Sequence, residues 1–239
     1  SVRLVGSEMC IRDRLMIKDI IIAIDGHSGC GKSTTSRLLA KNLNFKYLDS
    51  GAMYRAVTLY FVNKGVSQND TKKIKDELNN IIIDFKYVED NQHIFLNDQD
   101  VENEIRSDEI SNQVSLFSSN SSIRKFLVNK QKTFGINKNI VVEGRDITTV
   151  VFPDAEIKVF MTADIQVRAK RRFNEMKSKN PDITYSDVIK NLEDRDIQDS
   201  TRKDSPLMVA DDAFILDTSD LEINDQVDKI INFISNKFS

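Results

Sequence analysis

Cysteine and histidine are scarce in this sequence. The 239 residues include two cysteines and two histidines. Cys10 and Cys30 make a poor disulfide framework, and no Cys/His cluster has the spacing of a structural zinc site. Because free thiols fit a reducing compartment, we expect a cytoplasmic protein.

Long apolar runs and a strong net charge are also missing. No run approaches the roughly 20 residues that a membrane span needs, and no secretory-signal pattern is visible. With 34 basic and 37 acidic residues the net charge is only −3, which implies no general field for polyanions. We therefore expect no membrane and no nucleic-acid polymer as partners. Any anion site must be built locally.

The first residues differ from the rest of the chain. Residues 1–14 have no convincing period of 3.6 or 2, and an apolar run begins only after Met16. The stretch also resembles a translated sequencing adapter. We predict that residues 1–15 are a non-native or disordered extension, with a native tail as the alternative. Their deletion should leave activity and melting temperature unchanged.

What remains alternates between strand and helix patterns. Residues 20–24 form a continuous apolar run rich in β-branched side chains, which is typical of a strand buried on both faces of a parallel sheet. Residues 32–42 then have helical spacing, and Asn44 is a plausible helix end. We expect further core strands at residues 140–142, 157–161 and 214–217. Further helices are expected at 53–62, 167–177, 190–199 and 227–238.

The middle of the chain has a different character. Residues 81–88 and 93–96 are separated by a polar turn and predict an antiparallel hairpin, and Val101 is expected to begin a third short strand. Residues 107–134 are compatible with helices. The 40% hydrophobic content fits one core domain with insertions. We predict an α/β core at residues 16–74 and 136–239 and an inserted lobe at 75–135.

One motif indicates phosphate chemistry. Residues 26–33 satisfy G-x-x-x-x-G-K-[ST] between a predicted strand and a predicted helix. Glycines let such a loop wrap phosphate oxygens, and backbone N–H groups at the helix N-terminus favour negative charge. Lys32 can reach the β- and γ-phosphates, and the Ser33 hydroxyl can contact Mg²⁺. The predicted ATP site is Gly26, His27, Ser28, Gly29, Cys30, Gly31, Lys32, Ser33 and Thr34, with Ser33 as the metal contact.

This loop alone does not name the phosphoryl acceptor. GTPases use the same loop, but no N-K-x-D guanine signature is present, since residues 63–66 fail at the fourth position. An anionic acceptor approaching ATP needs a second set of cations facing the loop, and arginines are plentiful in this chain.

Several motifs together resemble the bacterial-type cytidylate kinases from about Ile20 onward. The matching stretches are I-D-G-x-S-G-x-G-K at 24–32, L-D-S-G-A-M-Y-R at 48–55, E-I-R at 104–106, G-R-D at 144–146 with T-V-V-F-P-D-A at 149–155, and residues 195–202. The resemblance implies an α/β parallel-sheet P-loop kinase core with an inserted NMP-binding lobe and a short lid near residues 168–181. It also implies a monomer that transfers the γ-phosphoryl group of ATP to CMP or dCMP.

The resemblance assigns roles to residues outside the loop. Ser50, Arg55 and Arg145 would hold the acceptor phosphate, for which a planar guanidinium is suited. The implied cytosine readers are Ser115, Arg124, Asp146 and Arg202, and the implied ribose contacts are Arg195 and Asp199. Arg106 would also belong to the acceptor site, and the implied lid arginines are Arg168, Arg171 and Arg172. The expected catalytic set is Lys32, Arg145, Arg171 and Arg172.

Alternatives stay open at a few positions. Glu143 ends a predicted strand, where it could associate with Mg²⁺ or cap the next element. Tyr54 fits core packing better than a base platform. Neither His27 nor His93 is expected to be catalytic.

The chain also departs from the family pattern at two positions. Thr148 places a β-branched side chain where the family usually has glycine, and Cys30 stands where alanine is common, so that thiol modification could obstruct the phosphate site.

The rival functions are a kinase of the same architecture acting on UMP, dTMP or shikimate, and a regulatory P-loop NTPase module.

Overall fold

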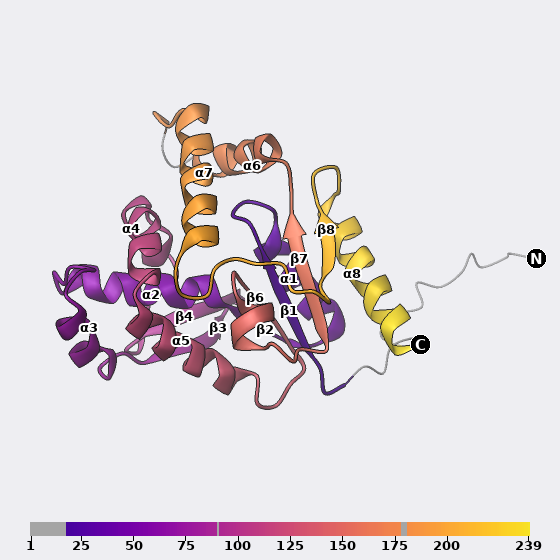
Figure 1. Cartoon of the computed structure of the whole chain (residues 1–239), viewed down its shortest axis with the longest axis horizontal. Helices are drawn as coiled ribbons and strands as arrows, with labels where there is room; N and C mark the ends of the chain where they lie inside the picture. The colour runs from indigo at the N-terminus through magenta and orange to yellow at the C-terminus, as the bar shows by residue number, and fades with distance from the viewer. Residues whose placement is uncertain (1–17, 90, 178–180) are drawn as a thin grey trace, which may run out of the picture.

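A five-stranded parallel sheet forms the centre of the molecule (Figure 1). The computed structural model describes residues 18–89, 91–177 and 181–239, so the predicted extension at 1–15 lies outside the described residues. The strands, in sheet order, are β2 (Lys46–Asp49), β6 (Ile140–Gly144), β1 (Ile21–Gly26), β7 (Ile157–Thr162) and β8 (Phe214–Asp217). All four neighbouring pairs are parallel, which confirms the α/β fold class.

Strand β1 lies in the middle of the sheet and is buried along its whole length. Its alternate residues pack into two different hydrophobic clusters, because side chains of a strand point to opposite faces. Ile21 and Ala23 join one cluster, and Ile22 and Ile24 join the other. This explains the continuous apolar run in the sequence.

Two helices cover one face of the sheet. Helix α1 (Lys32–Leu43) ends at Asn44, whose φ of 57° is the left-handed conformation typical of a helix C-terminus. Helix α8 (Ile223–Phe238) packs beside α1, and both contribute to the cluster around Ile22. The other face is covered by α2 (Ser50–Asn63), α5 (Ser121–Phe134) and a short π-helical turn, η3 (Ile147–Val151).

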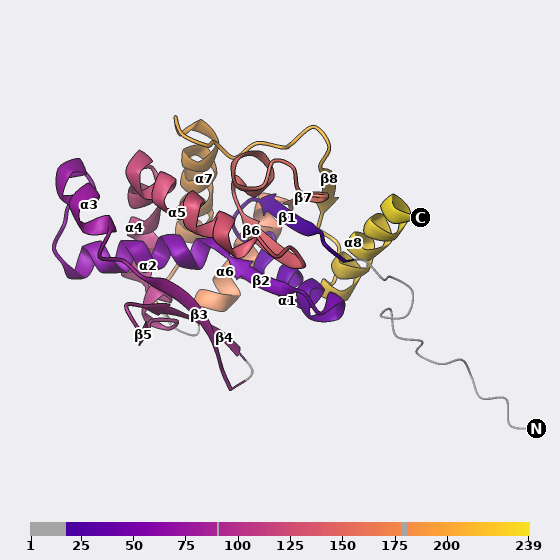
Figure 2. The same ribbon diagram turned by 90° about the horizontal axis from the view of Figure 1, so that it is seen from below.

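The segment between α2 and β6 forms a lobe at one end of the sheet (Figure 1). Its elements are α3 (Thr71–Leu78), β3 (Ile83–Val88), β4 (Asn91–Leu96), β5 (Gln99–Asp100), η2 (Glu104–Arg106), α4 (Asp108–Ser118) and α5. The antiparallel hairpin β3–β4 is confirmed and projects from the lobe in Figure 2. A third strand is present, but it ends at Asp100, so the prediction that Val101 begins it was wrong. The Val101 side chain is buried in the core, which accounts for its apolar character.

Helices α6 (Ile165–Lys177) and α7 (Tyr185–Thr201) pack against each other above the sheet (Figure 1). A small apolar cluster around Ala169, Val188 and Leu192 holds the pair together. Part of the predicted lid falls between them, and residues 178–180 lie outside the described residues. Within the described part of the chain, no helix combines the length and apolar character that a membrane crossing requires.

Candidate active site

The carboxyl ends of the central strands open into a cavity of about 590 Å³ between the sheet, the lobe and the α6–α7 pair. Such an edge of an open α/β sheet is where ligands usually bind. The predicted residues that line it are Ser28, Gly29, Gly31, Lys32, Ser33, Thr34, Ser50, Arg55, Arg106, Ser115, Arg124, Arg145, Asp146, Arg171, Arg172, Arg195, Asp199 and Arg202. Gly26, His27 and Cys30 are close in sequence to this set but do not line the cavity.

The phosphate loop between β1 and α1 has a backbone conformation that requires glycine at several positions. A Cβ on Gly26 would lie 1.9 Å from the carbonyl oxygen of Met161, and Gly29 and Gly31 have φ values of 78° and 94°. The Thr218 hydroxyl donates a hydrogen bond of 2.8 Å to the carbonyl oxygen of Cys30. The loop is therefore held from the end of β8 as well as by its own turn.

Lys32 is buried at the start of α1 and faces the cavity. Its Nζ donates a hydrogen bond of 2.8 Å to the carbonyl oxygen of His27, inside the same loop. Burial lowers the pKa of Lys32, and the positive charge of Arg145 acts in the same direction. Two cations of the predicted catalytic set thus lie close enough to repel each other, which a bound polyphosphate would relieve.

Oxygen donors surround Ser33 at the first turn of α1. Glu143 lies beside it, is buried, and accepts a hydrogen bond of 2.5 Å from the Tyr47 hydroxyl. Burial and the negative charge of Asp49 raise the pKa of Glu143. Hydroxyl and carboxylate oxygens are the ligands that Mg²⁺ prefers, so this group fits a nucleotide-bound Mg²⁺. Among the described residues, no group of three or more His, Cys, Asp or Glu side chains could hold a metal by itself.

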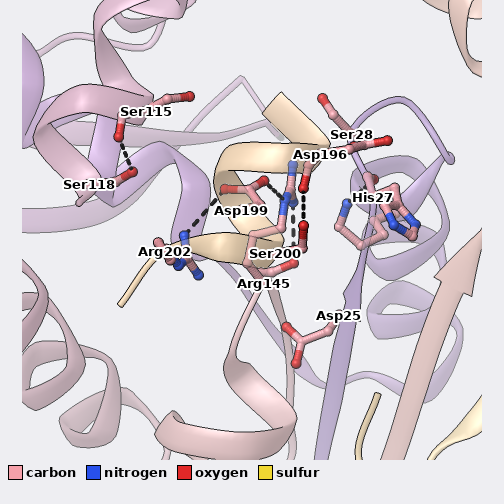
Figure 3. Close-up of polar contacts among 12 residues, drawn as sticks. Asp25, His27, Ser28, Ser115, Ser118, Arg145, Asp196, Asp199, Ser200 and Arg202 are labelled. Atoms are coloured by element: carbon pink, nitrogen blue, oxygen red, sulfur yellow. Dashed lines mark hydrogen bonds and ion pairs between the residues drawn. The ribbon is translucent and has the colours of Figure 1, made fainter. Parts of the chain in front are cut away.

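The turn after β6 presents the next set of side chains. Ser50, at the start of α2, donates a hydrogen bond of 2.6 Å to the carbonyl oxygen of Glu143. Gly144 permits this close approach, because a Cβ there would lie 2.5 Å from the Ser50 Oγ. Arg145 follows at once and donates to Asp199 at 2.8 Å (Figure 3).

Several arginines lie together on one side of the cavity. Arg55 donates to the Ser111 hydroxyl at 2.9 Å, and burial together with the charge of Arg195 lowers its pKa to about 9. Burial and the charge of Arg145 lower the pKa of Arg195 to about 10. Like charges gathered in a buried site are unfavourable without a counter-ion. The cavity therefore suits an anionic ligand such as a phosphate.

Asp146 and Arg124 meet deep in the wall of the cavity. They form a buried ion pair in which 4% of each side chain is exposed, and Arg124 also donates to the carbonyl oxygen of Ser118 at 3.1 Å. Tyr54 lies beside them, with the Arg124 guanidinium 5.4 Å from its ring centre. Within the described residues, the Tyr54 hydroxyl, Arg124 Nε and Arg202 Nη2 are buried without a hydrogen-bond partner. These groups remain available to a polar ligand.

Asp199 lies between two arginines on the other wall (Figure 3). It accepts from Arg145 at 2.8 Å and from Arg202 at 3.3 Å. Burial favours the neutral acid, but the charges of Arg145 and Arg202 outweigh it and hold the pKa of Asp199 below its usual range. Asp199 and Arg195, the ribose contacts that the resemblance implies, both line the cavity, and the ion-pair partners of Asp199 are Arg145 and Arg202.

The three lid arginines have different surroundings. Arg171 donates to the carbonyl oxygen of Thr218 at 2.7 Å, and Arg172 pairs with Glu175 at 3.2 Å. Both line the cavity. Arg168 does not line the cavity. It is buried, donates to the carbonyl oxygen of Ser28 at 3.2 Å and forms an ion pair of 2.7 Å with Asp196. In this structure Arg168 therefore ties α6 to the phosphate loop and to α7.

The chain is similar to known proteins over almost its full described length. The family model described as cytidylate kinase matches residues 22–236. The chain belongs to the cytidylate kinase family. A curated cytidylate kinase of Fusobacterium nucleatum is 47% identical over 219 residues, covering 92% of this chain and 97% of that protein. A cytidylate kinase of Phocaeicola vulgatus is 47% identical over 215 residues, covering 88% and 94%.

A solved structure shares the fold at low identity. An uncharacterized protein from Eubacterium ventriosum superposes with a TM-score of 0.50 and 15% identity, covering 90% of this chain and 98% of that one. At this identity the likeness concerns the fold alone.

Sequence reasoning left some cavity residues of this cytidylate kinase family member without a role. Asp49 and Tyr54 both line the cavity, and both lie inside the L-D-S-G-A-M-Y-R stretch that carried the resemblance. Tyr54 packs in the core, as its apolar ring suggested, and also borders the cavity. Ser118 lies three residues after Ser115 on α4, on the same helix face, so helical periodicity could have indicated it.

The structure also shows the surroundings of Cys30 and of the two histidines. Cys30 is fully buried, and its thiol donates to the carbonyl oxygen of His27, so the thiol is less open to reagents than its place in the loop suggested. His27 packs edge-on against Phe160, and burial lowers its pKa. His93, on the hairpin, pairs with Asp100 at 2.7 Å.

Proposed function

We propose that this chain is a (d)CMP kinase, which transfers the γ-phosphoryl group of ATP to CMP or dCMP and yields ADP with CDP or dCDP. The proposal is carried by the buried Arg124–Asp146 pair, which borders the same cavity as the phosphate loop. Family membership and the arginines around Arg55 support the same function.

Recognition of cytosine follows from the polar groups around this pair. Cytosine offers an exocyclic amine as a donor and N3 and O2 as acceptors. A carboxylate at Asp146 can accept from the amine, and arginine N–H groups can donate to N3 and O2. The unpartnered atoms of Arg124 and Arg202 would then gain partners that are absent among the described residues. Uracil lacks the amine, so it leaves the Asp146 carboxylate without that donor.

Transfer would rest on alignment and charge neutralisation. The acceptor phosphate is ionised near neutral pH, so no strong general base is needed. Lys32 and the loop N–H groups would hold the donor phosphates, while Arg55, Arg145 and Ser50 hold the acceptor phosphate. Arg171 and Arg172 border the cavity from α6 and would neutralise the charge that develops on the transferred group. Closure of the predicted lid would exclude water and favour transfer over hydrolysis.

Mg²⁺ supplied with ATP would add positive charge at the loop and neutralise part of the charge of the phosphates. Ser33 would hold it, and the carboxylates of Glu143 and Asp49 would supply negative charge nearby. The same arrangement would favour Mg²⁺ association over a purely capping role for Glu143.

Acceptor profiling tests the function. ADP release from ATP and Mg²⁺ is measured with CMP, dCMP, UMP, AMP, dTMP and shikimate offered separately. We expect turnover with CMP and dCMP and much weaker turnover with UMP. Turnover with another acceptor would contradict the cytosine assignment, and ADP release without any acceptor would favour an NTPase module. The family resemblance also favours a cytoplasmic monomer, and light scattering after size-exclusion chromatography tests the oligomeric state.

A further inference from the structure

The turn that carries Arg145 and Asp146 is capped by a residue from a different strand. Asp25, at the end of β1, is fully buried beneath Arg145 in the close-up (Figure 3). Its carboxylate accepts hydrogen bonds of 2.9 Å from Ile147 N, 2.7 Å from Thr148 N and 2.7 Å from the Thr148 hydroxyl. These backbone N–H groups belong to the first residues of η3, where a helical turn leaves its donors unsatisfied.

Asp146 occupies the position that would normally provide this cap. It is the residue before η3, and aspartate at such a position usually accepts from the first N–H groups of its own turn. Here the Asp146 side chain makes no such hydrogen bond. Its carboxylate is paired instead with Arg124 in the cavity wall.

We propose that Asp25 and Thr148 are positioning residues for acceptor recognition, because their hydrogen bonds satisfy the η3 donors and leave the Asp146 carboxylate directed to Arg124 and the cavity. Without them, Asp146 turns back to cap its own N–H groups, and the base site loses its carboxylate. The kinetic part of this inference rests on the proposed function.

The Thr148 hydroxyl adds to these hydrogen bonds a donor that the glycine of the family pattern would lack. The family pattern has glycine here, which could offer only its backbone N–H. Thr148 is 2% exposed and adds a third donor to the Asp25 carboxylate. Charge-assisted hydrogen bonds of this kind are shorter and stronger than neutral ones. The β-branched side chain therefore fixes the turn.

The position of Asp25 in the sheet places it directly beside the turn that carries Arg145 and Asp146. Asp25 and Gly144 are register partners on the neighbouring strands β1 and β6. Asp25 immediately precedes Gly26, the first residue of the phosphate loop. Burial raises the pKa of Asp25 to about 6, against the lowering effect of the Thr148 and Ile147 hydrogen bonds. The burial of this carboxylate is costly, and these three donors compensate it together with the nearby positive charge of Lys32.

The test compares two substitutions of one side chain. Thr148→Val removes the hydroxyl at nearly constant shape, Thr148→Ser keeps it, and Thr133→Val is the matched control. The Thr133 hydroxyl makes a hydrogen bond of equal length, 2.7 Å, to Lys130 O on the exposed side of α5. We expect Thr148→Val to raise the KM for CMP roughly tenfold and to lower the preference for CMP over UMP.

The remaining kinetic constants separate positioning from general damage. The KM for ATP should stay within about twofold of wild type in Thr148→Val, since the phosphate loop itself is unchanged. Thr148→Ser should behave like wild type, and so should Thr133→Val. A Thr148→Val enzyme with unchanged acceptor KM and selectivity would overturn the inference, and so would an equal rise in both KM values.

A crystal structure of Asp25→Asn, or of Thr148→Val if the first variant does not fold, tests the geometry without turnover. We expect the Asp146 carboxylate to have left Arg124 for the N–H groups of η3. An unchanged Arg124–Asp146 pair would overturn the inference. If the wild-type protein fails to use CMP, the proposed function falls, while this structural comparison still decides whether Asp25 and Thr148 direct Asp146.

Discussion

Arg124 reaches from α5 of the lobe to Asp146 beside the central sheet, and their charged groups form an ion pair with 4% of each side chain exposed. Because the pair is buried, removal of one partner leaves an uncompensated charge in the interior. The pair therefore holds α5 of the lobe to the turn after β6, at the proposed base site.

Substitution of Asp146 should change base selectivity. Asp146→Asn keeps the shape but replaces the acceptor-only carboxylate, so we expect the ratio of kcat/KM for CMP over UMP to fall. Asp146→Ala should also lower the free energy of unfolding, by about 3 kcal/mol, because Arg124 loses its partner. Asp76→Asn, on the exposed face of α3, is the control. Unchanged discrimination in Asp146→Asn would remove Asp146 from the base site.

Lys32 should matter for the rate of transfer. Its ammonium group is the loop cation expected at the donor phosphates, so Lys32→Ala should lower kcat roughly a hundredfold or more. Lys41→Ala, at the exposed end of the same helix, should retain activity. Steady-state kinetics and thermal melting of both variants make the comparison. A nearly active Lys32→Ala enzyme would contradict the predicted role of the loop.

Gly144 should be required for the acceptor site. A Cβ there would meet the Ser50 Oγ at 2.5 Å and Ile147 Cγ1 at 2.7 Å, so Gly144→Ala must displace Ser50 or the turn. We expect a higher KM for CMP with a smaller change in the KM for ATP. Gly65→Ala meets no atom within 4 Å, and its positive φ should lower stability alone. Equal acceptor KM values in the two variants would show that the close contact is not needed.

Arg168 and Arg172 should separate stability from catalysis. Arg168→Ala leaves the Asp196 carboxylate without its ion-pair partner, and we expect a loss of about 3 kcal/mol in the free energy of unfolding. Arg172 is more exposed and borders the cavity, so Arg172→Ala should lower kcat with little effect on stability. Urea denaturation and kinetics on both variants test this contrast. It fails if Arg172→Ala is the less stable protein.

The stability of the lobe should depend on pH through Glu77. Hydrogen bonds from Tyr60, Asn80 and Lys64 lower the pKa of Glu77 to about 2 from its usual 4.5. A carboxylate whose pKa is lower in the folded state stabilises the protein above pH 4.5, and this contribution is lost as the pH falls through the range from 4.5 to 2. Glu77→Gln should therefore be less stable than wild type at pH 7, with a difference that shrinks toward pH 3. A difference that does not vary with pH would contradict the assignment.

Local patterns in the sequence predicted most of the fold. The run at residues 20–24, the G-K-S motif and the break at Asn44 predicted a strand, a loop and a helix, and all three are present. These signals are local: apolar periodicity and turn-forming residues act within a few positions. The third strand of the lobe is two residues long, too short for alternation to mark its end at Asp100.

Contacts between distant residues were beyond such patterns. The bond from Thr148 to Asp25 joins residues 123 positions apart, and no property of either residue names the other. Arg168 had the same motif context as Arg171, yet it is directed toward Asp196 rather than toward the cavity. The Arg124–Asp146 contact could be placed in the base site only through the resemblance to a family, because burial of a charged side chain depends on the tertiary structure.

The parallel pairing of β1 and β6, with Asp25 opposite Gly144, has a consequence for the design of altered acceptors. The predicted ATP loop and the turn proposed for the acceptor phosphate follow adjacent strands, which backbone hydrogen bonds hold about 4.8 Å apart. In the proposed mechanism the sheet sets the spacing of the two phosphate sites, while Ser115 and Arg124 come from the lobe. A library of lobe side chains that keeps Arg106 and Ser111, which lie at the proposed acceptor-phosphate site, can therefore explore new nucleobases without changing the two strands.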